Sequence, residues 1–261
     1  MKKLIFYIIA ITILSFSAYG QPFSGGSGSS NDPYLISSHQ DLTNLVVMTN
    51  TTNTSGVHFL LTNTITTPCT TPIGYEVIQS GYTRFFQGTF DGGGNEIYLD
   101  ITNNSSYVAV GLFGATLGAT IKNLTVRGTV TNNDLIRGAA GGIVGKAYRN
   151  TTIINCVNLA SVTGTSSVGG IVGIFDYDNY ITPSTLNIIQ CVNAARVRGI
   201  DGIGGILGNG SGGSGSGSFF VGVNINECLN IGTIICTSFY CGGIVGAGDG
   251  NVSINTCVNA G

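Results

Sequence analysis

The chain has 261 residues, and its hydrophobic content of 43% is enough to form a substantial core. Charged residues make up only 8% of the chain, whereas an ordinary soluble domain has roughly 25%. This composition excludes the basic surface that nucleic acid requires, and it also excludes an acidic tail. We therefore expect no nucleic-acid partner.

The N-terminus has the layout of a secretory signal peptide. Lys2 and Lys3 precede an apolar run from Leu4 to Leu14, and small residues follow up to Gly20. A helix that spans a membrane needs roughly 20 apolar residues, and this run is shorter. Residues 1–20 are thus predicted to be a signal peptide that is cleaved on export. The mature chain would have no membrane span and would be secreted or held at the cell surface.

The next segments predict a leader and a helix. Residues 21–37 are rich in Gly and Ser, which is typical of a flexible leader. Ser38 then stands as an N-cap before Leu42, Leu45 and Val46, which have helical spacing. We expect residues 38–57 to form a short amphipathic helix and a linker, with the helix capping the β-structure that follows.

Residues 58–261 contain a repeated motif with a period of roughly 28 to 38 residues. Its first part, Gly-[Leu/Ile]-x-Gly, begins at Gly111, Gly142, Gly170, Gly205 and Gly243. Its second part begins at Ile121, Ile153, Ile188, Ile225 and Ile254. A third short element is centred on Val130, Val162, Val197 and Ile234. Each element is rich in Val and Ile and bounded by Gly, Asn or Thr, which is typical of strands.

One copy of the motif cannot bury its apolar side alone, so successive copies must stack and pair equivalent strands. The repeat therefore predicts an all-β fold, a parallel β-helix with three sheets around one core, over residues 58–261. A β-propeller is the alternative fold. Propeller blades are usually longer, around 40 residues or more, and carry aromatic signatures that this repeat lacks.

Stacking places equivalent residues in columns about 4.8 Å apart. One column contains cysteine in four copies: Cys156, Cys191, Cys228 and Cys257. Leu124 fills the same slot in the first copy, so we interpret these thiols as small hydrophobic groups that face the core. The alternatives are disulfides between coils, which fit the geometry of in-register neighbours poorly, and a metal site, which would need clustered Cys and His ligands. We expect no metal and no cofactor.

A second column, two residues after the cysteines, contains asparagine. It reads Val126 in the first copy and then Asn158, Asn193, Asn230 and Asn259. Stacked amides can hydrogen-bond along such a column, so we expect an internal asparagine ladder with a structural role. The column just before the cysteines, from Asn123 to Thr256, is expected to face outward and is too irregular for ice binding.

Cys236 and Cys241 flank a four-residue segment, and in an exported protein they are candidates for a disulfide across that turn. The alternative is that Cys241 fills the core column that Ala140, Val168 and Ile203 occupy in other copies.

Two insertions leave the predicted stack at the same point of successive coils, from Ile174 to Leu186 and from Asn209 to Val223. They should therefore emerge on one side, where aromatic and acidic side chains could bind a cell-surface glycan or protein. The candidate binding residues are Tyr148, Arg149, Asp176, Tyr177, Asp178, Tyr180, Phe219 and Phe220. The alternative is that both insertions are variable spacers on a scaffold.

Catalysis has to be considered because many parallel β-helices act on polysaccharides. A glycosidase needs paired carboxylates at a defined separation. Asp176 and Asp178 are the best candidates, but no Lys or Arg lies near them in sequence, and a solvated loop is the ordinary explanation for them. We assign no catalytic residue. The leading hypothesis is a non-enzymatic surface repeat segment that acts as a scaffold or adhesin, and the alternative is a β-helix that binds or cleaves polysaccharide.

The chain resembles a known group in the segments GGSGSSNDPYLISSHQDLTNL, HFLLTNTI, FFQGTFDGGGNEI, VGLFG and IKNLTV and in the repeated GGIVG. In motif order it is similar to the GLUG-motif repeat proteins of bacterial surfaces over nearly all of the mature chain. The resemblance implies a right-handed β-helix in exported, often adhesin-like or protease-associated proteins, whose repeats are scaffolding without catalytic residues. The chain departs from that pattern because it ends within a repeat at Gly261 without a cap. We therefore expect a fragment truncated at its C-terminal end, whose open last coil self-associates end to end.

Overall fold

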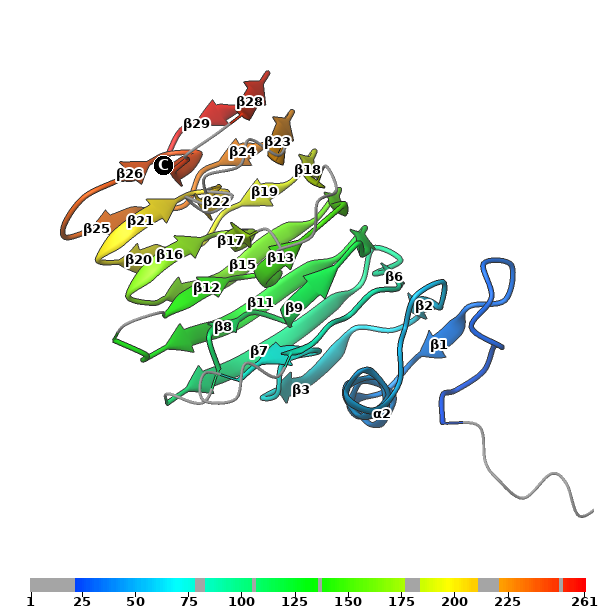
Figure 1. The fold of residues 1–261 in the computed structure, drawn as a ribbon. Helices are drawn as coiled ribbons and strands as arrows, with labels where there is room; N and C mark the ends of the chain where they lie inside the picture. The colour runs from blue at the N-terminus through cyan, green and yellow to red at the C-terminus, as the bar shows by residue number, and fades with distance from the viewer. Residues whose placement is uncertain are drawn as a thin grey trace, which may run out of the picture.

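The computed structural model describes residues 22–77, 83–104, 107–135, 138–176, 184–210, 221–248 and 251–261. The predicted signal peptide lies outside these residues. The described chain forms coils that stack along one axis, from the helix near the N-terminus to the last C-terminal strands (Figure 1). Equivalent strands of successive coils pair in parallel. This parallel β-solenoid confirms the predicted β-helix and excludes the β-propeller, which is an antiparallel architecture.

Two long sheets run the length of the stack. The first consists of β1 (Tyr34–Ile36), β2 (His58–Leu61), β6 (Thr89–Asp91), β10 (Thr120–Lys122), β14 (Thr151–Ile154), β18 (Ser184–Ile189), β23 (Val221–Asn226) and β28 (Asn251–Asn255). The second consists of β3 (Ile65–Cys69), β7 (Glu96–Asn103), β11 (Thr125–Asn132), β15 (Val157–Thr163), β19 (Val192–Asn193), β24 (Leu229–Asn230) and β29 (Val258–Asn259), with β20 (Val197–Gly199) and β25 (Ile234–Cys236) beside them.

Two shorter sheets complete the coils, so the described strands form four sheets along the stack where three were expected. The third sheet contains β8 (Ala109–Val110), β12 (Ala139–Gly141), β16 (Ser166–Gly169), β21 (Asp201–Gly204) and β26 (Cys241–Gly242). The fourth contains β9 (Phe113–Leu117), β13 (Val144–Tyr148), β17 (Val172–Asp176), β22 (Leu207–Asn209) and β27 (Val245–Ala247). A hairpin of β4 (Tyr75–Glu76) and β5 (Thr83–Arg84) lies outside these sheets. The extra sheet arises because each Gly-Gly-Ile-Val-Gly segment bends between two short strands instead of forming one.

The glycines of this motif bring the third and fourth sheets into direct backbone contact. A Cβ atom added to Gly173 would lie 2.8 Å from the carbonyl carbon of Ala140 in the preceding coil. Gly145 meets the backbone of Val110 in the same way. Because a side chain cannot fit between the two backbones, glycine is required at this position of each coil.

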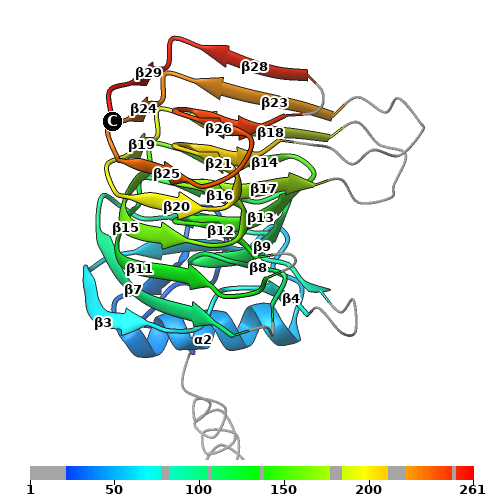
Figure 2. The ribbon, with the colours of Figure 1, turned by 90° about the vertical axis from the view of Figure 1, so that its left-hand side faces the viewer.

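The helix predicted to cap the stack is α2 (His39–Thr51), and it lies across the first coils (Figure 2). Leu42, Leu45 and Val46 are buried against the core, as their helical spacing predicted. Ser38 and Asp41 form a capping box, in which each side chain bonds the backbone N–H of the other residue. Among the described residues, no helix is long and apolar enough to cross a membrane.

The segment before the helix differs from the flexible leader expected for residues 21–37. Strand β1 pairs in parallel with β2, and the side chain of Phe23 is only 5% exposed. The ring centroids of Phe23 and Tyr34 are 4.6 Å apart, and that of Phe59 lies 5.7 Å from Phe23. The prediction of a flexible leader was wrong because it relied on the many Gly and Ser residues. The aromatic and aliphatic residues between them pack against the core and fix the segment in place.

The four cysteines of the repeat face the core in a column, as the sequence indicated. Cys156, Cys191 and Cys228 are buried, Cys257 is half-buried, and all four thiols are free. Each thiol donates to a backbone carbonyl, for example Cys191 Sγ to the oxygen of Ile189 at 3.3 Å. Burial raises the pKa of Cys191 well above its ordinary value, so this thiol stays protonated and behaves as a small hydrophobic group.

The asparagines of the repeat form a buried column of amides, which we call the inner ladder. Asn158 Nδ2 donates to Asn193 Oδ1 at 2.8 Å, and Asn193 Nδ2 donates to Asn230 Oδ1 at 2.7 Å. Asn230 Nδ2 continues the ladder to Asn259 Oδ1 at 2.6 Å. Each amide also bonds its own turn; Asn158, for example, bonds both the N–H and the carbonyl of Ala160. The amides therefore satisfy the backbone of successive turns as well as one another.

The glycine motif and the inner ladder depend on each other. In the last four Gly-x-x-Gly segments the first glycine packs against an amide of the ladder, so that a Cβ on Gly170 would lie 2.4 Å from Asn193 Cγ. Gly205 meets Asn230 at the same distance. The two motifs recur together in the sequence because a side chain at the glycine would occupy the space of the asparagine.

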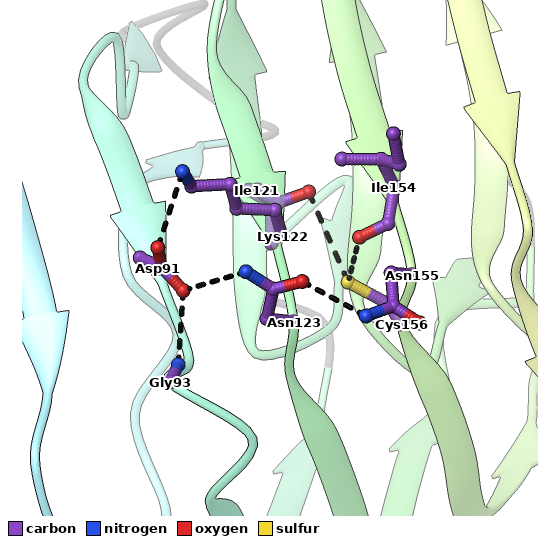
Figure 3. A network of polar contacts seen from close by, with 8 residues as sticks. All are labelled: Asp91, Gly93, Ile121, Lys122, Asn123, Ile154, Asn155 and Cys156. Atoms are coloured by element: carbon purple, nitrogen blue, oxygen red, sulfur yellow. Dashed lines mark hydrogen bonds and ion pairs between the residues drawn. The ribbon is translucent and has the colours of Figure 1, made fainter.

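A second column of polar side chains, the outer ladder, lies at the corner between the first and second sheets. Asn155 Nδ2 donates to Asn123 Oδ1 at 2.8 Å, and Asn123 Nδ2 donates to Asp91 Oδ1 at 3.0 Å (Figure 3). Burial would raise the pKa of Asp91, but hydrogen bonds from Asn123 and Gly93 and the ammonium of Lys122 lower it. Asn123 and Asn155 have φ values of 54° and 52°, a left-handed conformation that asparagine tolerates.

Cys236 and Cys241 are joined in a disulfide across an exposed turn, with their Cα atoms 6.1 Å apart. Cys241 also pairs in register with Ile203, so it occupies the predicted column as well. Phe239 and Tyr240, between the two cysteines, are 73% and 67% exposed.

Candidate binding crevice

A cavity of about 310 Å³ opens between the third and fourth sheets, and we call it the crevice. Its lining residues are Glu76, Val108, Ala139, Lys146, Ser166, Ser167, Ile174 and Asp176. The lining residues come from the third sheet and Val108 directly before it, from the fourth sheet and, with Glu76, from strand β4. The carbonyl of Glu76 accepts a hydrogen bond from Val108 N at 3.0 Å, which holds β4 beside the third sheet.

Lys146 is the central charged residue of the crevice. It lies on β13, and its side chain is only 9% exposed. Its Nζ atom lies 3.1 Å from Glu76 Oε2 and 3.0 Å from Asp176 Oδ2. Tyr148, two residues further along β13, donates its phenol hydrogen to Glu76 Oε2 at 2.9 Å. Lys146 Nζ also lies 4.9 Å from the centroid of the Tyr148 ring, within the range of a cation–π contact.

The electrostatics of this cluster keep Lys146 and Tyr148 protonated. Burial would lower the pKa of Lys146, but Tyr148, Asp176 and Glu76 together raise it far above the ordinary value. Burial raises the pKa of Tyr148 well above its usual range, and the neighbouring ammonium offsets only part of this increase. Lys146 is therefore a permanent cation and Tyr148 a neutral hydroxyl, so neither is available as a general base near neutral pH.

Two serines bring unused hydroxyl groups to the crevice. Ser167 is only 8% exposed and has a left-handed φ of 54°. Gly202 and Tyr240, at the same turn of the next two coils, share this conformation, with φ values of 66° and 57°. The hydroxyls of Ser166 and Ser167 line the cavity and have no hydrogen-bond partner within the described part of the chain. Ser167 is therefore a largely buried residue whose hydroxyl is available to the contents of the crevice.

The structure brings together two of the predicted binding residues, Tyr148 and Asp176, which pair in register on β13 and β17. Arg149 follows them with a φ of 49° at the turn after β13, and it is not among the residues that line the crevice. The predicted residues Tyr177, Asp178, Tyr180, Phe219 and Phe220 lie outside the described residues. Asp176, which was considered with Asp178 as a carboxylate pair, contacts Lys146.

Sequence reasoning missed Lys146, Glu76 and Ser167. A signal for Lys146 was present, because the equivalent positions in the neighbouring coils hold Ala115 and Ile174. A lysine in a column of apolar residues indicates a buried charge that needs partners. Glu76 could not be found in this way, because it lies outside the repeat and reaches the crevice only through the hairpin.

Comparisons with known proteins place the fold but no function. No family model matches the chain. Halomucin from Haloquadratum walsbyi is 31% identical to it over 156 residues, which cover 57% of this chain and 2% of halomucin. The chain therefore spans only a small part of that protein's length.

A crystal structure of a candidate immunoglobulin A1 protease from Bacteroides ovatus matches with a TM-score of 0.64 and 22% sequence identity. The match covers 89% of this chain and 67% of that chain. At this level of identity the likeness shows the fold alone. The chain is thus a parallel β-solenoid repeat protein.

Proposed function

We propose that this chain is a segment of an exported surface repeat protein that acts as a scaffold or adhesin. In this proposal it binds a glycan or a protein through the crevice side of the coil stack and catalyses no reaction. The observation that carries the proposal is the crevice itself, a formed cavity with unused hydroxyls next to the ends of β17 and β22. Asp176, the last residue of β17, and Ile174 of the same strand are among the lining residues.

Support for export comes from the N-terminal sequence and from the similarity to a protein named halomucin. The resemblance to GLUG-motif repeats and a location at the cell surface belong to the same proposal.

The protonation states in the crevice favour binding over catalysis. A lyase needs a base close to its substrate, and the pKa values of Lys146 and Tyr148 are both shifted in the direction that keeps their protons on. The two groups instead hold Glu76 and Asp176 in fixed positions. A rigid set of donors and acceptors of this kind is suited to recognition.

The alternative, a β-helix that cleaves polysaccharide, has one observation in its favour. Glu76 and Asp176 contact the same ammonium, so an oxygen of each lies within about 6 Å of the other, close to the separation used by retaining glycosidases. Either carboxylate would have to exchange its contact with Lys146 for one with substrate.

A binding and turnover experiment separates the two functions. The purified chain is screened against a glycan panel for binding, and against the same panel for reducing ends and unsaturated products. We expect binding without product, and we expect the Glu76→Gln and Asp176→Asn variants to weaken the binding. Glu227→Gln is the control and should bind as the wild type does, because Glu227 is exposed, accepts a hydrogen bond from Gln190 Nε2 at 2.8 Å and does not line the crevice. Turnover that disappears in Glu76→Gln would overturn the scaffold proposal in favour of a glycosidase.

A further inference from the structure

We propose that the ligand of the crevice is a sugar with a free amino group, a hexosamine unit, and not an acidic sugar. This inference rests on the proposed function, because it names the ligand class of the same site. It starts from the charges that line the cavity. Among the described residues that line it, Glu76 and Asp176 are acidic and Lys146 is basic, so these residues together carry one net negative charge.

The positive charge of Lys146 is not available to a ligand. Its Nζ atom already contacts Glu76 Oε2 and Asp176 Oδ2 and lies over the ring of Tyr148. A uronate or another acidic sugar would meet two carboxylates and would find no free cation among the described lining residues. An ammonium group on the ligand would neutralise the excess charge.

The unused groups of the crevice match the donors of an amino sugar. Glu76 Oε1 has no partner among the described residues, because Lys146 and Tyr148 both contact Oε2. A carboxylate oxygen accepts a strong hydrogen bond from an ammonium donor. Ser167 is only 8% exposed and its hydroxyl has no partner among the described residues, so this hydroxyl can exchange hydrogen bonds with a sugar hydroxyl.

The crevice also has apolar lining residues, which suit the ring of a sugar. Val108, Ala139 and Ile174 are apolar lining residues, and they face the C–H groups of a ring without demanding hydrogen bonds. The volume of about 310 Å³ is at the lower end of pockets that hold small ligands, so the crevice accepts one or two sugar rings. A longer glycan would continue out of the crevice along the stack.

The test compares three short oligosaccharides by calorimetry with the purified chain at moderate salt: a glucosamine oligomer, its N-acetylated form and an oligogalacturonate. We expect the glucosamine oligomer to bind about tenfold or more tightly than the other two, as the loss of one charge-assisted hydrogen bond predicts. Glu76→Gln should remove this preference while leaving the affinity for the N-acetylated form unchanged. Ser167→Gly keeps the left-handed backbone and removes the hydroxyl, so it should weaken all amino sugars to a similar extent.

The outcomes separate the inference from the proposed function. Tighter binding of the N-acetylated or acidic oligomer in a Glu76-dependent manner would overturn the amino-sugar inference and leave glycan binding intact. Equal weakening by Glu76→Gln and by the control Glu227→Gln would show general charge attraction, and this result also overturns the site. Absence of binding to every glycan and protein tested would overturn the proposed function together with the inference.

Discussion

The two ladders make the same kind of hydrogen bond in different surroundings. In the inner ladder, Asn193 bonds Asn230 at 2.7 Å, and in the outer ladder Asn155 bonds Asn123 at 2.8 Å. Asn193 is completely buried, whereas Asn155 is exposed. Water can replace a lost partner only on the outside, so the cost of breaking a bond depends on burial rather than on its length. The inner ladder should therefore specify the fold, and the outer ladder should contribute little to stability.

The largest effect is expected from Asn193→Asp. This change places a carboxylate between two buried amides, with no cation nearby in the column, and removes the donor that bonds Asn230 and the carbonyl of Ala195. An unpaired buried charge costs about 3–5 kcal/mol. The free energy of unfolding, measured by urea denaturation, should fall by this amount. A loss of unfolding free energy no larger than that of Asn155→Asp would show that the two ladders are equally exposed in solution, and it would contradict this prediction.

A smaller but still large loss is expected from Gly170→Ala. The added Cβ would lie 2.2 Å from the carbonyl oxygen of Gly205 and 2.4 Å from Asn193 Cγ, so backbone and ladder must both shift. Overpacking of this kind costs about 1–3 kcal/mol. Gly222→Ala is the matched control, because its Cβ would meet only Thr185 Cγ2, at 3.6 Å. Equal melting temperatures for the two variants would contradict the dependence of the ladder on the glycine motif.

The N-terminal cap of helix α2 contains another buried polar side chain, Asp41, whose contribution to stability can be compared with that of the inner ladder. Asp41 is 5% exposed and accepts hydrogen bonds from Ser24 Oγ at 2.7 Å, Ser37 N at 2.9 Å and Ser38 N at 3.1 Å. Burial alone would raise its pKa, but these hydrogen bonds lower it below the ordinary value. Asp41→Asn should cost about 1–2 kcal/mol, the usual range for a lost N-terminal cap with charged acceptors.

The pH dependence of this cap has a definite sign. Because the pKa of Asp41 is depressed in the folded state, its stabilisation is present above the unfolded pKa of about 3.9 and is lost as the pH falls through the folded pKa. The difference in melting temperature between wild type and Asp41→Asn should therefore be constant near neutral pH and shrink below about pH 4. A difference that is the same at pH 7 and at pH 2.5 would show that the charge of Asp41 has no part in the cap.

The sequence predicted the coil stack because side chains in one column must suit their neighbours. The replacement of Leu124 by cysteine and of Val126 by asparagine in later copies was enough to indicate inward-facing slots. The crevice could not be predicted in the same way. It depends on Glu76, which lies in a hairpin 70 residues before Lys146 in the chain and contacts the Lys146 ammonium. A periodic pattern reports neighbours along a column and contains no information about a strand outside the repeat.

The smallest effect is expected from Asn155→Asp, which applies to the outer ladder the change made at Asn193. Aspartate tolerates the left-handed φ of 52° at this position, so no backbone strain is added. The lost bond to Asn123 Oδ1 is replaced by water, because Asn155 is exposed. The free energy of unfolding should change by about 0.5 kcal/mol or less, the usual range for surface positions. A loss that approaches that of Asn193→Asp would mean that the outer ladder is as important to the fold as the inner one, and that hydrogen-bond geometry rather than burial sets the stability of the stack.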